Sequence, residues 1–330
     1  MERPRIAVTL GDPCGVGPEI TWNAFNQVYE KLDYDLEILG DIRIYDSLGI
    51  SVSDEFRSCF TSSFNENSLS KIQSVGKECE RGGEHAYTYL MASVSSVLNG
   101  SVRGLINGPL SKSSVAKVSP GFLGHTQFYE EHLLAADSTE AMMCFWGNRF
   151  SLLLLSHHVP LAQVSEMLLS RDQGAIVLKC MKSFQDLLGE LRIGVCGFNP
   201  HAGEQGLMDH GEDRHLGRLV RDLKISGYNV QGPLPADTLF CPGILDAFNM
   251  IVSSHHDQGL VPFKMAHFPG GVGFTLGLSV PRFTVDHGTA FDLAGTGKAS
   301  CHSMKDAFLL MNRALKLDQR GELVQIAEQM

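Results

Sequence analysis

The chain has 330 residues, of which 43% are hydrophobic and 19% charged, and its formal net charge is −10 at pH 7. This length allows a large core and two domains, and the composition is that of a globular protein. The negative charge argues against a nucleic-acid partner. No apolar run approaches the roughly 20 residues that cross a bilayer, and the first apolar stretch is too short for a secretory signal. Eight cysteines without a CxxC spacing indicate reduced thiols and a cytoplasmic location.

Strands and helices are expected to alternate along most of the chain. In chain order we predict a strand at 5–10, a helix at 18–32, a strand at 36–40, irregular surface at 51–80, a helix at 83–98, a strand at 103–108, a helix at 126–136, two strands within 141–156 joined at Gly147-Asn148, helices at 160–170 and 172–190, a strand at 192–200, a helix at 212–226, a strand at 249–254 and a helix at 302–316. This order is typical of an α/β protein whose sheets carry helices on both faces.

Paired histidines follow two apolar runs, as His157-His158 in "LLLLSHHVPL" and His255-His256 in "NMIVSSHHDQGL". Side chains of an extended segment alternate between its faces, so only one histidine of each pair is expected to face a common site. His201 follows a third strand, and ligands gather beyond the carboxyl ends of strands in α/β sheets. Three such histidines could bind a divalent metal and leave positions open for substrate; otherwise they are ordinary loop histidines.

Charged side chains stand near the same strand ends. Asp257 and Glu204 could orient a ligand histidine, or they only cap turns. Lys112, Lys264 and Arg282 could clamp a phosphate, although each alone is more often a surface residue. Their joint occurrence favours a small phosphorylated substrate.

Three segments rich in glycine or small residues could approach a ligand. "GHTQF" places His125 and Thr126 at the start of a helix, where phosphate binding is favourable. "GDPCGVGPE" lacks the last glycine of the dinucleotide fingerprint, so it is either an anion-binding loop or a plain turn. In the long loop "VDHGTAFDLAGTGKAS", Asp292 could accept hydrogen bonds from a ribose, or it is a solvated acid.

Seven ordered segments resemble one known family. "TLGDPCGVGPE", "GHTQF", "HHVPL", "GFNPHAGEQG", "GPLPADT", "HHDQGLVPFK" and "VDHGTAFDLAGTGKA" are similar to the 4-hydroxythreonine-4-phosphate dehydrogenases of vitamin B6 biosynthesis. The resemblance covers nearly the whole chain and is weakest over residues 40–100.

The resemblance implies a site for each kind of ligand. It assigns the metal to His158, His201 and His256, with His256 supplied by the other subunit of a homodimer. The implied substrate contacts are His125, Thr126, Lys264 and Arg282, together with the position of Gly273, where the family has an asparagine. The implied cofactor contacts are Gly288, Thr289 and Asp292. The proton acceptor is left open among Lys112, Asp257 and a metal-bound hydroxide.

The resemblance also implies an α/β fold like that of isocitrate and isopropylmalate dehydrogenases, with two α/β/α domains and a cleft between them. Residues 1–125 and 285–330 would form the first domain, and residues 126–284 the second. The cofactor would be NAD, with NADP as the alternative, and Asp292 would favour NAD by repelling a 2′-phosphate. The metal would be zinc, or else magnesium, manganese or cobalt.

The implied reaction oxidises the 3-hydroxyl of 4-phosphooxy-L-threonine and then releases CO₂ to give 3-amino-2-oxopropyl phosphate. Gly273 keeps two related substrates open, threonate 4-phosphate and erythronate 4-phosphate. The alternative of another class is a protein that binds a metal or nucleotide on the same fold without catalysis.

Overall fold

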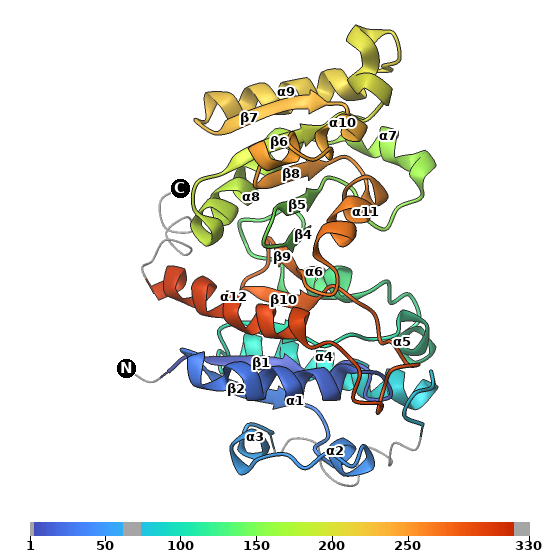
Figure 1. The fold of residues 1–330 in the computed structure, drawn as a ribbon, viewed down its shortest axis with the longest axis vertical. Helices are drawn as coiled ribbons and strands as arrows, with labels where there is room; N and C mark the ends of the chain where they lie inside the picture. The colour runs from blue at the N-terminus through green and yellow to red at the C-terminus, as the bar shows by residue number, and fades with distance from the viewer. Residues whose placement is uncertain (1–2, 62–73, 320–330) are drawn as a thin grey trace. The chain divides into compact units, whose positions relative to one another are not determined.

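The chain forms two compact units in the computed structural model, which describes residues 3–61 and 74–319 (Figure 1). The first unit runs to Ala141 and resumes at Val272, and the second is Met142–Gly271. The predicted boundaries, at 125 and 285, placed residues 126–141 and 272–284 in the second domain. By their contacts these residues lie in the first unit. The division into separately folding domains stays a prediction.

The first unit is built on five strands in the order β2-β1-β3-β10-β9. Neighbouring strands run parallel except β9, which is antiparallel to β10. Helices α1 and α12 pack on each other and α4 packs on β1 and β2, so that both faces are covered (Figure 1). Its strands are β1 Arg5–Thr9, β2 Asp35–Leu39, β3 Leu105–Asn107, β9 Val272–Leu276 and β10 Arg282–Val285; its helices are α1 Gly17–Val28, η1 Tyr29–Lys31, α2 Arg43–Ser47, α3 Asp54–Ser58, α4 Glu80–Leu98, α5 Lys112–Val118, α6 His125–Leu133 and α12 His302–Gln319.

The second unit has strand order β4-β5-β8-β6-β7, parallel except for the β4–β5 hairpin. Helix α11 packs on β5 and β8, whereas α9 packs on β7 and contacts α7 and α8. An apolar core of mostly phenylalanine and leucine joins the strands to α11. Its strands are β4 Met142–Trp146, β5 Ser151–Leu154, β6 Arg192–Cys196, β7 Asn229–Leu234 and β8 Met250–Ser253; its helices are α7 Leu161–Ser170, α8 Gln173–Leu188, η2 Pro200–Gly206, α9 Glu212–Ile225, α10 Ala236–Leu239, η3 Leu245–Ala247 and α11 His256–His267.

The elements confirm the predicted α/β class and most of the predicted segments. The region 51–80 was wrong in part, because α3 lies within it and α4 begins at Glu80; residues 62–73 of this prediction lie outside the described residues. Two elements that were not predicted, α11 and β10, contain residues that are unusual in a helix or a buried strand. Helix α11 contains Gly259 and Pro262, and β10 begins with the buried Arg282. Within residues 3–61 and 74–319 the structure has no helix with the length and hydropathy of a membrane span.

The turn from β1 into α1 depends on close backbone packing. A Cβ atom at Gly17 would lie 1.9 Å from the carbonyl oxygen of Leu10, so this position excludes any larger residue. Pro18 follows in the first turn of α1, where its missing N–H costs nothing. A side chain at Gly17 would separate the loop from the strand that it follows.

Gly17→Ala should lower the free energy of unfolding by at least about 1–3 kcal/mol, because the added methyl group overlaps backbone that cannot yield. Gly217→Ala is the matched control, since Gly217 lies inside α9 and a Cβ atom added there would meet no other atom within 4 Å. It should stabilise the protein by about 0.5–1 kcal/mol through helix propensity. Urea denaturation of both variants measures this, and equal stabilities would contradict the packing argument.

The same loop buries the carboxyl group of Asp12. Its Oδ1 accepts the backbone N–H of Cys14 at 2.9 Å, whereas its Oδ2 is buried without a hydrogen-bond partner. Burial, with a smaller contribution from the charge of Glu78, raises the pKa of Asp12 to about 6. Since the folded-state pKa is raised, Asp12 favours the folded state at low pH, and this contribution is lost as the pH rises from about 4 through about 6.

Asp12→Asn removes this titration and keeps an oxygen for the Cys14 N–H. Relative to wild type, the variant should therefore gain about 3 kcal/mol in unfolding free energy between about pH 4 and about pH 8. Denaturation curves at both pH values measure the difference. If the difference in unfolding free energy between wild type and variant stays constant with pH, the pKa of Asp12 is not raised in the folded protein.

Candidate functional site

Three parallel strands of the second unit bring the histidine segments to one edge of the sheet. β5 pairs with β8 and β8 with β6, with Leu154 opposite Ser253 and Val195 opposite Val252. The carboxyl ends of these strands are therefore level. Gln258 also joins the segments, because its side chain accepts the Ser254 N–H at 2.8 Å and donates to Gly197 O at 2.7 Å.

Both histidine doublets line one pocket of about 300 Å³. The pocket is lined by Ser156, His157, His158, Val159, Leu161, Val164, His255, His256 and Asp257. The expectation that alternation turns one histidine of each pair away was wrong, because in neither pair are both residues extended. His158 has a φ of 42°, and His255 caps α11, which begins at His256.

His158 and His256 are placed as two ligands of one ion could be. Their ring centroids are 5.8 Å apart. The Nδ1 atom of His256 lies 2.7 Å from Oδ1 of Asp257, and this hydrogen bond lowers the pKa of Asp257. A carboxylate at one ring nitrogen leaves the other for a metal, which is a common arrangement in metal sites. The donor chemistry of this pair thus fits a divalent cation.

The third predicted ligand does not join this pair. His201 is exposed and does not line the pocket, and in the described part of the chain no three His, Cys, Asp or Glu side chains gather closely enough to hold a metal. A single chain therefore shows two of the three predicted ligands together. These two are His158 and His256, rather than the His158 and His201 pair expected within one subunit.

His201 begins a turn of unusual backbone conformation. Residues 201–205 all have positive φ angles between 43° and 80°, although only Gly203 is a glycine. Each of the other residues costs of order 1 kcal/mol in the left-handed region, so other contacts must hold the turn. Backbone strain of this kind clusters at functional sites.

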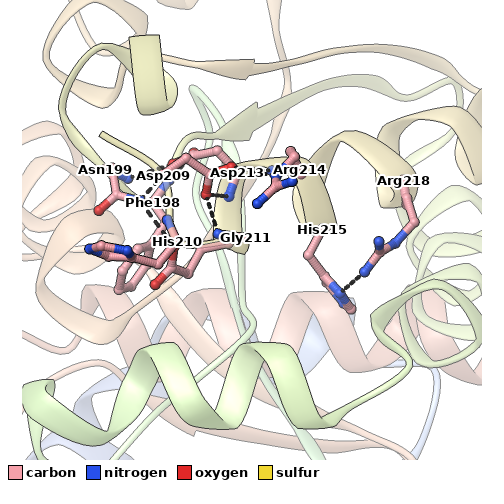
Figure 2. Close-up of polar contacts among 10 residues, drawn as sticks. Phe198, Asn199, Asp209, His210, Gly211, Asp213, Arg214, His215 and Arg218 are labelled. Atoms are coloured by element: carbon pink, nitrogen blue, oxygen red, sulfur yellow. Dashed lines mark hydrogen bonds and ion pairs between the residues drawn. The ribbon is translucent and has the colours of Figure 1, made fainter. Parts of the chain in front are cut away.

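Asp213, in the first turn of α9, holds the segment before this turn (Figure 2). Its carboxylate accepts the backbone N–H groups of Phe198 and Asn199 at 2.7 and 3.1 Å, and the Asn199 side chain at 2.9 Å. The carboxylate of Asp209 in turn accepts the N–H groups of Gly211 and Asp213 at 2.8 and 3.0 Å (Figure 2). These charge-assisted bonds fix the approach to His201. Glu204 is exposed on the strained turn, and its role stays a prediction.

The first unit contains a buried arginine among neutral groups. Arg282 is 2% exposed; its Nε donates to Asn107 Oδ1 at 2.7 Å and its Nη1 to Thr275 Oγ1 at 2.8 Å. Its Cζ lies 5.3 Å from the ring centroid of Tyr129, and its Nη2 is buried without a partner. Burial lowers the pKa of Arg282 to about 10, so it stays charged at neutral pH. A buried cation held by neutral acceptors favours binding of an anion.

Helix α6 brings further donors to this group. His125, its first residue, stacks on Tyr129 with centroids 6.5 Å apart, and its Nε2 is buried without a hydrogen-bond partner. Burial and the charges of Arg282 and Lys112 lower the pKa of His125 well below its usual range. Lys112 passes over the start of the helix, since a Cβ at Gly124 would lie 3.3 Å from its Nζ. Burial also lowers the pKa of Lys112.

The structure thus gathers three of the predicted phosphate-binding residues, His125, Lys112 and Arg282. Thr126 is buried on the same helix. Lys264 lies exposed on α11 in the second unit, and its role stays a prediction. Gly273 lies on β9 two residues from Thr275, so both positions face the same side of the strand.

Sequence reasoning missed the neutral residues around Arg282. These are Asn107, Thr275 and Tyr129. Asn107 ends the buried strand β3, and its Nδ2 donates to Thr9 Oγ1 at 3.0 Å and to Tyr129 OH at 2.8 Å. A polar side chain at a buried strand end was the available signal, because such a group needs hydrogen-bond partners.

The predicted cofactor loop packs on the glycine-rich turn after β1. The carbonyl of Thr289 accepts the N–H of Val16 at 2.9 Å, and a Cβ at Gly15 would lie 2.7 Å from that carbonyl oxygen. This close packing gives the glycine at 15 a structural purpose. Gly288 has open space around it and Asp292 is exposed, so both are accessible to a ligand.

Comparison with known proteins shows the family. Residues 35–311 match the family of pyridoxal phosphate biosynthetic protein PdxA. A Symbiobacterium thermophilum protein named for D-threonate 4-phosphate dehydrogenase activity is 32% identical, covering 92% of this chain and 95% of its own. A Geobacter metallireducens protein named 4-hydroxythreonine-4-phosphate dehydrogenase is also 32% identical, covering 97% of this chain and 98% of its own.

Solved structures show the fold. The Klebsiella pneumoniae 4-hydroxythreonine-4-phosphate dehydrogenase superposes with a TM-score of 0.72 at 26% identity, covering 94% of this chain and 99% of that one. A β-decarboxylating dehydrogenase from Thermococcus kodakarensis has a TM-score of 0.52 at 13% identity, covering 97% of this chain and 84% of that one; it shows a shared fold alone. These matches confirm the expected fold class. Together with the seven motifs and the family match, they establish that this chain belongs to the family of pyridoxal phosphate biosynthetic protein PdxA.

Proposed function

We propose that this protein oxidises 4-phosphooxy-L-threonine at its 3-hydroxyl with NAD and a divalent metal, and that the resulting β-keto acid loses CO₂ to give 3-amino-2-oxopropyl phosphate. The step belongs to pyridoxal phosphate biosynthesis. The named relatives support the reaction, and the buried Arg282 cluster supports a phosphorylated substrate. We further propose that the protein acts in the cytoplasm, in keeping with its eight cysteines without a CxxC spacing.

The observation that carries the substrate class is the pair of unused donors in the first unit. Arg282 Nη2 and His125 Nε2 are both buried, and neither has a hydrogen-bond partner among the residues that the structure describes. A bound phosphate would accept from both, and charge-assisted bonds of this kind contribute about 1.5–3 kcal/mol each. The lowered pKa of His125 keeps its ring neutral. A neutral ring donates a hydrogen bond from Nε2 only in the tautomer that carries its proton on Nε2.

A second substrate is favoured by two observations. D-threonate 4-phosphate has the same phosphate end and carries a hydroxyl in place of the amine, and one relative is named for it. In addition, Gly273 stands where the resemblance places an asparagine, on the strand face that presents Thr275 to Arg282. Without the asparagine amide, the part of the substrate beyond the phosphate would lose a hydrogen-bond partner. The contacts of the phosphate with Arg282 and His125 would stay the same.

For the proton acceptor, the geometry favours Lys112 over Asp257. The carboxylate of Asp257 is engaged by His256, which lowers its pKa and makes it a weak base. Burial lowers the pKa of Lys112 instead, which raises the fraction of neutral amine. Lys112 also lies beside the start of α6, where the phosphate clamp begins.

We propose that His158, His201 and His256 hold the metal. A divalent cation there would polarise the hydroxyl that is oxidised and stabilise the charge that develops as CO₂ leaves. The pocket supports His158 and His256 as a pair, and the strained turn supports His201. Because one chain does not gather all three, we propose a homodimer in which the partner subunit completes the set. Exposed apolar residues of the second unit, Leu161, Leu207, Met265 and Phe268, are 66–84% exposed and could form its interface.

For the cofactor, we propose that NAD binds the 285–300 loop through Gly288, Thr289 and Asp292. The carboxylate of Asp292 would accept from the adenosine ribose and repel the 2′-phosphate of NADP. The exposure of Asp292 and the open space at Gly288 support this assignment.

The purified protein with a divalent metal should reduce NAD, measured as NADH absorbance, when given 4-phosphooxy-L-threonine. His125→Gln should lower kcat/KM by about 10–100-fold through loss of a charge-assisted bond, and NAD should be used better than NADP. His132→Gln on the same helix is the control and should retain wild-type kinetics, because His132 is exposed. If neither 4-phosphooxy-L-threonine nor D-threonate 4-phosphate gives NADH, the proposed function is ruled out.

Gly273→Asn should separate the two substrates. The added amide would contribute about 0.5–1.5 kcal/mol to a substrate that fits it, which lowers KM by no more than about tenfold. If 4-phosphooxy-L-threonine is the substrate, its KM should fall in the variant. A loss of its turnover, together with higher wild-type kcat/KM for D-threonate 4-phosphate, would assign the second substrate.

Pairwise mixing of inactive variants tests how the metal ligands are shared. If His158 and His201 come from one subunit and His256 from the other, mixed His158→Ala and His256→Ala chains should regain activity, because one site per heterodimer is whole. If His158 and His256 belong to the same chain's site, this mixture stays inactive, while His201→Ala with His256→Ala recovers. Failure of both mixtures despite proven subunit exchange would exclude a shared site.

A further inference from the structure

Two cysteines of the first unit touch beneath the proposed cofactor loop. Cys14, in the turn after β1, and Cys79, at the start of α4, have their Sγ atoms 3.5 Å apart although they are 65 residues apart in sequence. The backbone fixes this approach, because the N–H of Gly76 donates to the carbonyl of Cys14 at 2.8 Å. A disulfide needs a sulfur separation of about 2.05 Å, so small side-chain movements would suffice.

The two thiols have different environments. Cys14 is fully buried, and burial together with the nearby Asp12 raises its pKa. Cys79 is partly exposed and is the N-cap of the 19-residue helix α4, where its sulfur accepts the N–H of Gly82 at 3.4 Å. Cys79 is the more accessible of the two thiols, so it is the one that meets an oxidant first. Cys14 is then placed to attack the same sulfur.

Both cysteine segments contact the 285–300 loop. Next to Cys14, the N–H of Val16 donates to Thr289 O at 2.9 Å. Before Cys79, a Cβ at Gly76 would lie 3.2 Å from Phe291 O, and one at Gly295 would lie 3.4 Å from the Val75 side chain. A bond between the cysteines would therefore tie together the two segments on which this loop rests.

We propose that Cys14 and Cys79 form a reversible intramolecular disulfide that restrains the 285–300 loop. With glutathione disulfide as oxidant, the Cys79 thiolate attacks one sulfur and releases one glutathione thiolate. The Cys14 sulfur then attacks Cys79 Sγ, loses its proton to solvent and releases the second glutathione. Two protein thiols are oxidised and one glutathione disulfide is reduced to two thiols. The disulfide itself does not depend on the proposed function.

Peptide mapping of the full chain after treatment with glutathione disulfide, without reduction, should find a Cys14–Cys79 link. The link should raise the thermal midpoint by at least about 4 °C, since it closes a long loop of the unfolded chain. It should also slow hydrogen exchange of peptides within 286–300. Dithiothreitol should reverse both effects.

Cys79→Ser is the informative variant, because serine is a preferred N-cap and should keep α4 intact. It should show neither the midpoint rise nor the slower exchange, whereas Cys241→Ser, at an exposed cysteine of the second unit, should behave as wild type. A stable glutathione adduct on Cys79 with no link to Cys14 would overturn the proposal. A link that leaves exchange in 286–300 unchanged would overturn the restraint of the loop.

Discussion

The guanidinium of Arg282 is buried against Asn107, Thr275 and Tyr129, and this one charge organises the first unit. Its contacts connect four elements: Arg282 lies on β10, and its three neighbours lie on β3, β9 and α6. Neutral acceptors bind two of its three nitrogens, Nε and Nη1, and leave Nη2 without a partner among the described residues. A carboxylate in place of these neutral acceptors would neutralise the guanidinium, and a paired arginine attracts a further anion only weakly. The fold therefore maintains a desolvated cation that none of the carboxylates in the described part of the chain neutralises.

In the second unit, hydrogen bonds to carboxylates stabilise a strained turn. Its turn at 201–205 is held in the left-handed region, and the carboxylate of Asp213 fixes the two residues before Pro200 by three hydrogen bonds. Asp209 accepts the Asp213 N–H and so orders the start of α9. Strain at His201 is thus opposed by charge-assisted bonds made by residues that never need to touch a ligand. Asp209 and Asp213 therefore use their carboxylates mainly to bind backbone N–H groups on either side of the strained turn.

The sequence predicted the parts of this site that follow from strand ends, and missed those that depend on local backbone conformation and on tertiary contacts. Apolar runs before His157 and His255 correctly located β5 and β8, since buried parallel strands read as continuous apolar segments. Alternation then failed, because His158 adopts a positive φ and His255 caps a helix. Helix α11 was not predicted because Gly259 and Pro262 disfavour a helix. Packing of α11 on β5 and β8 outweighs this unfavourable propensity. The neighbours of Arg282 could not be found from spacing, because they come from strands and a helix far apart in the chain.

Under the proposed function, the residues that would bind the phosphate, His125, Lys112 and Arg282, also connect binding to proton transfer. In the free protein, burial and neighbouring cations lower the pKa of His125, and burial lowers that of Lys112. A bound phosphate dianion acts in the opposite direction on both, because a nearby negative charge favours the protonated form. In the proposed complex the bound phosphate therefore offsets part of the lowering that burial causes in the pKa of Lys112, and it makes His125 the better hydrogen-bond donor. Under the proposed function, Arg282 would supply a fixed positive charge for the phosphate, so that Lys112 would not have to stay protonated to hold it.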